Sequence, residues 1–212
     1  MSLRTQIIQK LVHINEAIFF YPKLKKFYTE NLKKEKINIL DVGANKGQSI
    51  DFFLKINPKA GFDAFEPNKK LFIYLQNKYK ASDKIRLHNS GVSNIKGELV
   101  FHENILDETS TFEELNLDSK YLEKKAKVLG VTKENIIVDS YKVPVIRLVD
   151  FLKENPKEYD VLKIDVEGHE LQCLQGLFEE EAFLPIRFIQ LESHNDDMYL
   201  SNNQHHEIEE SA

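Results

Sequence analysis

A mostly apolar run near the start of the chain ends in a turn that carries two glycines. The run covers residues 37–42, Gly43 and Gly47 follow it, and a helical pattern begins at about Gln48. Glycine tolerates positive φ and lets a ligand approach the backbone, while the first turn of a helix presents unpaired N–H groups. A strand, a glycine turn and a helix in this order are typical of a nucleotide-binding site. The segment therefore predicts an α/β fold with a ligand at the carboxyl end of its first strand.

Four more short apolar runs alternate with helical patterns along the rest of the chain. They cover residues 62–65, 85–88, 161–164 and 186–191. This alternation predicts a mostly parallel sheet with helices on both faces, which is a Rossmann-like three-layer sandwich. A chain of 212 residues with 42% hydrophobic content is long enough for one such domain and short for two.

Two segments fall outside this alternation. Residues 1–36 have apolar side chains at helical spacing, which predicts an N-terminal helical segment, broken near Pro22, before a domain over residues 37–212. Residues 97–146 have a different texture and predict a strand and helix insertion within that domain.

Inside the insertion, two extended segments flank a charged helix. Residues 98–102 and 136–146 are predicted to pair as antiparallel strands. The helix is predicted over residues 121–129 and ends at Gly130, a residue type that favours helix C-termini.

Charge and cysteine content narrow the class of partner. A formal net charge of −5 gives no overall attraction to polyphosphate, so a nucleic-acid binder is disfavoured and a small-molecule or glycan partner is favoured. The single cysteine, Cys173, cannot form an intrachain disulfide, which favours a cytoplasmic location. No stretch has the roughly 18 consecutive apolar residues of a transmembrane helix, so no membrane span is predicted.

The glycine turn departs from the dinucleotide-binding pattern. Aligned on Gly43, the pattern G-x-G-x-x-G needs glycines at positions 41 and 46, where the chain has Asp41 and Lys46. A carboxylate at Asp41 would repel a pyrophosphate and favour a cationic amino-acid ligand. A sulfonium cofactor fits this charge.

The ends of the next two strands supply candidate nucleoside contacts. Glu66 follows Gly43 at about the distance where Rossmann-like folds place an acid that binds the ribose hydroxyls. Asn89, after the third strand, is placed to hydrogen-bond the adenine edge. The predicted cofactor-binding residues are Asp41, Gly43, Ala44, Asn45, Gly47, Gln48, Glu66, Pro67, Asn89, Ser90 and Asp165.

Several separated blocks resemble the FkbM family of methyltransferases, from about Ile37 to the end of the chain. The blocks are residues 41–48 (DVGANKGQ), 65–67 (FEP), 89–93 with Gly97, 143–145 leading to 150–152, and, as the most specific, 162–170 (LKIDVEGHE). The resemblance implies a class I methyltransferase fold, S-adenosylmethionine as the cofactor, and transfer of a methyl group mostly to oxygen, often of a sugar or a secondary metabolite.

The candidate catalytic residues follow the fourth and fifth strands of the sheet. They are Asp165, Glu167, His169, Glu192 and His194. His194 is the preferred general base because histidine titrates near neutral pH, although a loop histidine without a role is equally compatible. Helix capping is the alternative for Glu167 and His169.

Two further expectations concern charges near these residues. Asp165, Glu192 and His194 could instead bind a divalent metal that lowers the pKa of the acceptor hydroxyl. Lys163 lies within the fourth strand and needs a carboxylate partner if it is buried, for which Glu192 on the neighbouring strand is a candidate.

The end of the chain departs from the class I pattern. The antiparallel strand pair that usually follows the fifth strand is expected to be missing, which would leave residues 186–191 as an exposed sheet edge. Pairing of this edge predicts a homodimer. The shortened end also makes a catalytically inert scaffold an alternative to an active O-methyltransferase, and a nucleotide-sugar or nicotinamide enzyme of Rossmann type is a third interpretation.

Overall fold

Five parallel strands form the central sheet of the computed structural model, which describes residues 21–106, 109–178, 185–192 and 196–200. The strand order is β3-β2-β1-β7-β8, and each neighbouring pair is parallel. The bounds are β1 Asn38–Val42, β2 Gly61–Phe65, β3 Ile85–His88, β7 Tyr159–Ile164 and β8 Ile186–Leu191. All five predicted strands are confirmed, and the mostly parallel Rossmann-like sheet with them.

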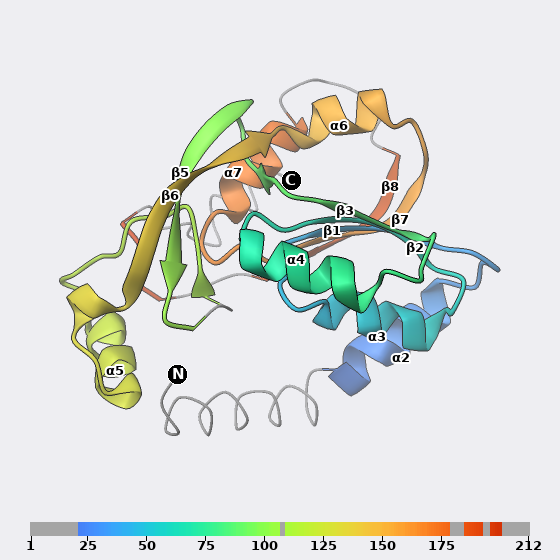
Figure 1. Ribbon diagram of the computed structural model, residues 1–212. Helices are drawn as coiled ribbons and strands as arrows, with labels where there is room; N and C mark the ends of the chain where they lie inside the picture. Colours follow the sequence, from blue (N-terminus) through green and yellow to red (C-terminus); the bar gives the residue numbers. More distant parts are fainter. Residues whose placement is uncertain (1–20, 107–108, 179–184, 193–195, 201–212) are drawn as a thin grey trace.

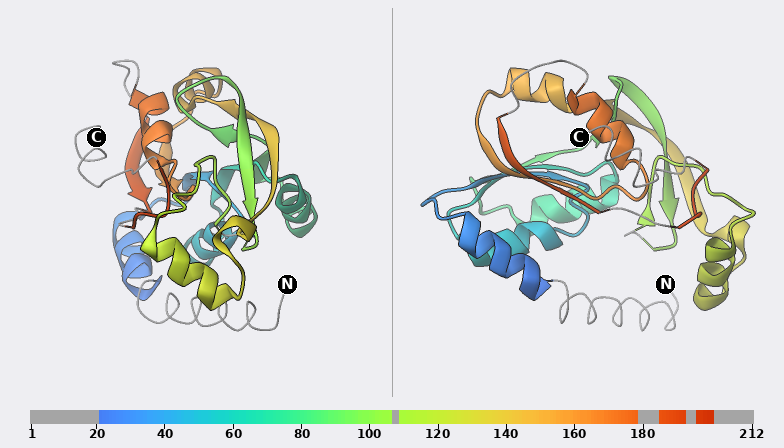
Figure 2. Two further views of the ribbon diagram at one scale, coloured as in Figure 1. Left: turned by 90° about the vertical axis from the view of Figure 1, so that its left-hand side faces the viewer. Right: turned by 180° about the vertical axis from the view of Figure 1, so that it is seen from behind.

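Helices cover both faces of this sheet, as Figures 1 and 2 show. On one face lie α2 Tyr21–Asn31, α3 Gln48–Ile56 and α4 Lys69–Lys78, and on the other lie α6 Leu148–Glu154 and α7 Glu170–Phe178. Two separate apolar clusters result, one packed beneath α2 and α3 and one beneath α6 and α7. Strands β1, β2 and β7 are buried almost throughout, which explains why they read as continuous apolar runs.

A second, three-stranded sheet stands beside the first (Figure 1). Its order is β4-β6-β5, with β4 Gly91–Val92, β5 Gly97–Asn104 and β6 Ile137–Ile146. The predicted antiparallel pairing is confirmed between β5 and β6, whereas the short β4 pairs parallel to β6.

The predicted helix of the insertion is confirmed as α5 Lys120–Leu129. Ser119 caps its first turn by accepting a hydrogen bond from the Leu122 N–H, and Gly130 ends it in the left-handed conformation with φ 76°. A 3-10 turn over Lys133–Asn135 then leads into β6. The apolar face of α5 packs on Leu115, Met198 and Tyr199, so the insertion also contacts the segment that follows β8.

The two ends of the chain bear on three expectations. Pro22 lies in the first turn of α2, and residues 1–20 and 201–212 lie outside the described residues, so the helical segment before Pro22 and the loss of the C-terminal strand pair stay predictions. Among the described strands, β8 pairs with β7 alone. In the same described part of the chain, no helix has the length and apolar character that crossing a membrane requires.

Candidate cofactor site and catalytic loop

The turn after β1 is built from three residues in the left-handed region. Gly43, Asn45 and Gly47 have φ values of 83°, 47° and 82°. The Gly43 and Ala44 N–H groups both donate to the carbonyl oxygen of Phe65, at 3.1 and 3.0 Å, so the turn is fastened to the end of β2. Gly47 then begins α3. The expected strand, glycine turn and helix are present.

Gly43 also lies against the end of β7. A Cβ atom added at Gly43 would collide with the carbonyl oxygen of Asp165 and meet the Val166 side chain at 3.4 Å. The turn therefore needs glycine here for space as well as for φ. This contact joins the predicted cofactor loop to the predicted catalytic loop.

Glu66 follows β2 with a buried carboxyl group, 4% exposed. One oxygen accepts from the Asn45 N–H at 2.7 Å and the other from the Asn68 N–H at 2.8 Å. Burial raises the pKa of Glu66 to about 7, although both backbone N–H groups lower it. A carboxyl group that titrates near neutrality thus lies beside the glycine turn.

Side chains near Glu66 form hydrogen bonds with the backbone of the loop after β2. Asn89 donates through its side-chain nitrogen to the carbonyl oxygens of Glu66 at 2.9 Å and Pro67 at 3.2 Å. The predicted contact of Asn89 with adenine stays a prediction, and the structure gives this side chain a role in holding the loop after β2. Asn68, which the sequence analysis missed, caps α4 by accepting from the Lys70 N–H at 2.9 Å.

The remaining predicted cofactor contacts include Gln48 at the glycine turn and Ser90 in the loop after β3. Ser90 precedes β4, and both Ser90 and Gln48 are half-buried. The side-chain oxygen of Gln48 accepts from the Lys46 N–H at 3.1 Å, and that N–H also donates to Asn45 Oδ1 at 2.7 Å. The backbone of the turn is therefore held by its own side chains.

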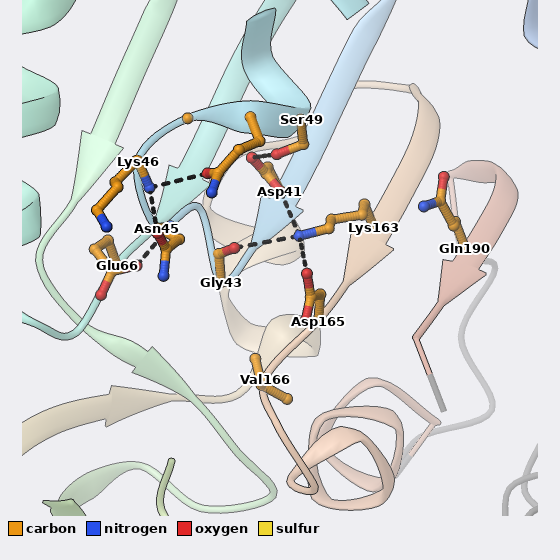
Figure 3. Close-up of polar contacts among 12 residues, drawn as sticks. Asp41, Gly43, Asn45, Lys46, Ser49, Glu66, Lys163, Asp165, Val166 and Gln190 are labelled. Carbon is orange, nitrogen blue, oxygen red and sulfur yellow. Dashed lines mark hydrogen bonds and ion pairs between the residues drawn. The ribbon is translucent and has the colours of Figure 1, made fainter. Parts of the chain in front are cut away.

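Lys163 connects β7 to the glycine turn (Figure 3). Its Nζ lies 2.9 Å from Asp165 Oδ2, 3.2 Å from the Gly43 carbonyl oxygen and 3.7 Å from Asp41 Oδ1. Burial lowers the pKa of Lys163, but Asp165 and Asp41 raise it by more, so the ammonium form is favoured. Asp165 and Asp41 are its ion-pair partners.

Two expectations about these charges need correction. The predicted partner of Lys163 was Glu192, but the ion pairs of Lys163 are with Asp165 and Asp41, and Glu192, exposed beyond the end of β8, adds its charge to theirs. Asp41 was expected to present its carboxylate to the ligand, but it is fully buried and accepts a 2.5 Å hydrogen bond from Ser49. Burial raises the pKa of Asp41, and Lys163 and Ser49 oppose that rise.

Glu167 sits in the loop after β7 with a strained backbone. Its φ of 55° is one of two positive values among the described non-glycine residues, the other being Asn45 in the cofactor loop. Thr111 donates to the Glu167 carbonyl oxygen at 2.7 Å, and the Tyr199 hydroxyl lies 3.4 Å from Glu167 Oε2. Burial, followed by the charge of Asp165, raises the pKa of Glu167 well above its usual range.

His169 is buried, and its ring is hydrogen-bonded to two other side chains. Its Nδ1 lies 2.5 Å from Glu113 Oε1 and its Nε2 lies 3.0 Å from Ser93 Oγ, and the residue is 5% exposed. Both ring nitrogens are engaged, which leaves none to take a proton from an acceptor. Glu113 and Ser93 were not among the predicted site residues, because no local pattern links residues so far apart in the sequence.

Of the remaining catalytic candidates, Glu192 lies within the described residues and His194 does not. His194 lies outside the described residues, so its predicted role as base is untested. Glu192 donates its N–H to the Ile164 carbonyl oxygen at 3.0 Å, at the carboxyl end of β7. Within the described ranges, no group of three or more His, Cys, Asp or Glu side chains could hold a metal ion.

Comparison with known proteins agrees with this geometry. Residues 41–211 match the family model described as the methyltransferase FkbM domain. The chain is also similar to the 2-O-methyltransferase NoeI of Sinorhizobium fredii (strain NBRC 101917 / NGR234), with 27% identity over 172 residues that cover 79% of this chain and 68% of the relative. The match to the family model begins at Asp41, spans the glycine turn and continues through the loop after β7. The chain thus belongs to the FkbM family of methyltransferases.

Proposed function

We propose that the chain is an S-adenosylmethionine-dependent O-methyltransferase that acts on a hydroxyl group of a sugar or small metabolite. The observation that carries the proposal is the pair of acidic groups around Gly43. Glu66 lies on one side of the turn, and Asp165 with Lys163 lies on the other (Figure 3). A nucleoside with a cationic amino-acid extension needs acidic groups at both of its ends.

The residues present fit this cofactor. Glu66 already accepts two backbone N–H groups, and an ionised carboxylate there can also accept from ribose hydroxyls, in charge-assisted hydrogen bonds of about 1.5–3 kcal/mol each. Gly43 and Gly47 give the turn its positive φ values and its close packing against Asp165 and Tyr79, which set the shape of the backbone that the cofactor would approach. Asp165 provides a half-buried carboxylate at the amino-acid end. S-adenosylmethionine supplies an electrophilic methyl group on a sulfonium.

The part of the protein is to align the acceptor and remove its proton. Alignment of two reactants accounts for roughly 7–11 kcal/mol of a barrier, against about 10²–10⁴-fold in rate from a general base. Glu167, in its strained loop directly after Asp165 and Val166, is one candidate to take that proton. His194 remains the other candidate, and a metal bound by Asp165, Glu192 and His194 the third.

Oxygen as the acceptor atom is supported by the relative, whose name describes 2-O-methylation. The insertion and the segment after β8 meet at the catalytic loop, through Thr111 and Tyr199, and would shape the acceptor pocket. We also propose a cytoplasmic location, in keeping with the single buried cysteine.

Calorimetry with S-adenosylmethionine and NAD separates this proposal from the two alternatives. We expect binding of S-adenosylmethionine that weakens strongly in Glu66→Ala, and no heat with NAD. Binding of NAD alone would support a nicotinamide enzyme, and binding of neither cofactor would support an inert scaffold.

The acceptor is identified by a labelling experiment. The protein is incubated with methyl-labelled S-adenosylmethionine and a fractionated cell extract, and the fraction that gains label is analysed. Under the proposal the label survives mild base, because a methyl ether is stable there. A base-labile methyl ester in the product would contradict O-methylation of a hydroxyl.

A further inference from the structure

Lys163 is an ammonium group inside a parallel sheet. It lies on β7 between two apolar neighbours, Leu162 and Ile164, and only 8% of it is exposed. A buried lysine is rare without a charged partner, and apolar residues of similar size are often at least as stable at such positions. Stability of the sheet alone therefore gives little reason for a lysine here.

The three groups that Lys163 contacts belong to the predicted cofactor site. The Gly43 carbonyl oxygen is part of the glycine turn, Asp165 begins the catalytic loop, and Asp41 is the last residue but one of β1. Asp41 Oδ1 is buried and has no hydrogen-bond partner of its own, so the ammonium at 3.7 Å is the nearest described compensation for its charge. Lys163 thereby connects the turn of one strand to the end of its neighbour.

The formal charges of this cluster match one end of the proposed cofactor. Two carboxylates, Asp41 and Asp165, and one ammonium, Lys163, leave one net negative charge. Asp165 is its open member, with 28% of its side chain exposed against 11% for Lys163 and none for Asp41. S-adenosylmethionine carries two positive charges and one negative, which is the complement. Glu192 adds acidic charge nearby, which makes the compensation by Lys163 more important.

The cluster and Glu66 lie on opposite sides of Gly43 in Figure 3. Glu66 is therefore the group for the ribose end, and the Lys163 cluster is the group for the amino-acid end. Substitution of Glu66 should therefore weaken contacts with the ribose, and substitution of Lys163 should weaken contacts with the amino-acid part of the same ligand.

We propose that Lys163 is a positioning residue for the amino-acid half of the cofactor, because it orients the Gly43 carbonyl and Asp165 and balances the charge of Asp41. The proposal rests on the proposed function, since it assumes S-adenosylmethionine as the ligand. It concerns a residue that holds the site and does not itself react.

Calorimetry with S-adenosylmethionine and with adenosine tests the proposal, because adenosine lacks the amino-acid part. In Lys163→Met we expect binding of S-adenosylmethionine to weaken at least about tenfold, and binding of adenosine to change less than about threefold. Lys163→Arg keeps the positive charge and should lose less than Lys163→Met. Glu66→Ala is the matched control and should weaken both ligands.

The possible results test the role of Lys163 separately from the proposed function of the chain. Equal weakening of both ligands in Lys163→Met would mean a merely structural role, and unchanged binding of S-adenosylmethionine would mean no role at the site; either result overturns the inference. If the wild-type protein binds adenosine but not S-adenosylmethionine, the proposed function itself fails. Should Lys163→Met not fold, Lys163→Gln keeps a hydrogen-bond donor without charge and is held to the same comparison.

Discussion

Glu66 is a buried carboxyl group whose pKa lies near neutral pH. Burial raises its pKa from 4.5 to about 7, so the folded chain holds this proton more tightly than the unfolded chain. Its contribution to stability is present below pH 4.5 and is lost as the pH rises through about 7, by an amount on the order of 3 kcal/mol. Ionisation of Glu66, which a ribose-binding carboxylate requires, therefore lowers the free energy of unfolding.

Glu66→Gln tests this by removing the titration while keeping the shape of the side chain. We expect the free energy of unfolding of Glu66→Gln, relative to wild type, to be higher at pH 8 than at pH 5, since only the wild type loses stability in that window. Urea unfolding of both proteins at the two pH values measures the difference in their free energies of unfolding. The contributions of the other titrating groups are the same in both proteins and cancel in that difference. The same relative stability at both values would rule out the raised pKa.

Gly43 offers a second prediction at the scale of one residue. Gly97→Ala is a control with open space around the new Cβ atom, although its φ of 154° is also unfavourable for a side chain, and it should lose about 1–3 kcal/mol. Gly43→Ala should lose more, and should also weaken binding of S-adenosylmethionine, because its Cβ meets the backbone of Asp165. Urea unfolding of the two variants compares the losses, and equal values would contradict the close approach.

At the scale of elements, the buried contact between Glu113 and His169 holds the insertion against α7. Glu113→Gln keeps the size of the side chain but removes the charge that faces His169 Nδ1 at 2.5 Å. We expect it to lower the free energy of unfolding by about 1–3 kcal/mol, and to increase hydrogen exchange at residues 109–116. Glu114→Gln changes an exposed neighbour and should stay within about 0.5 kcal/mol of wild type. Equal effects of the two variants would show that the contact contributes nothing.

The elements themselves were largely predictable, and their contacts were not. The five core strands, the antiparallel pair of the insertion and the end of α5 at Gly130 follow from local periodicity and turn chemistry. Asp165 was not predicted as a partner of Lys163, although side chains two residues apart in extended backbone share a face; Glu192, which was predicted, adds its charge. The pairing of His169 with Glu113 joins positions 56 residues apart, which no local pattern encodes.

At the scale of the whole molecule, the open question is association. Among the described strands β8 is an edge of the central sheet, and Ile189 on it is 38% exposed. We expect a dimer through this edge in sedimentation velocity, and dissociation in Ile189→Lys because a charge would be placed in the interface. Val100→Lys, on β5 of the other sheet and 44% exposed, is the control and should remain a dimer. A wild-type monomer at high concentration would refute the hypothesis.

The anchoring of the insertion by Glu113 also bears on how the family can diversify. The glycine turn and Lys163 belong to the core sheet, while Thr111 and Glu113 belong to the insertion that reaches the catalytic loop. If the insertion shapes the acceptor pocket, as proposed above, exchange of the insertion would change the acceptor preference and leave the glycine turn in place. Such a graft must bring its own acidic residue for His169, so a chimera with a neutral residue at position 113 should fold poorly until that one side chain is restored.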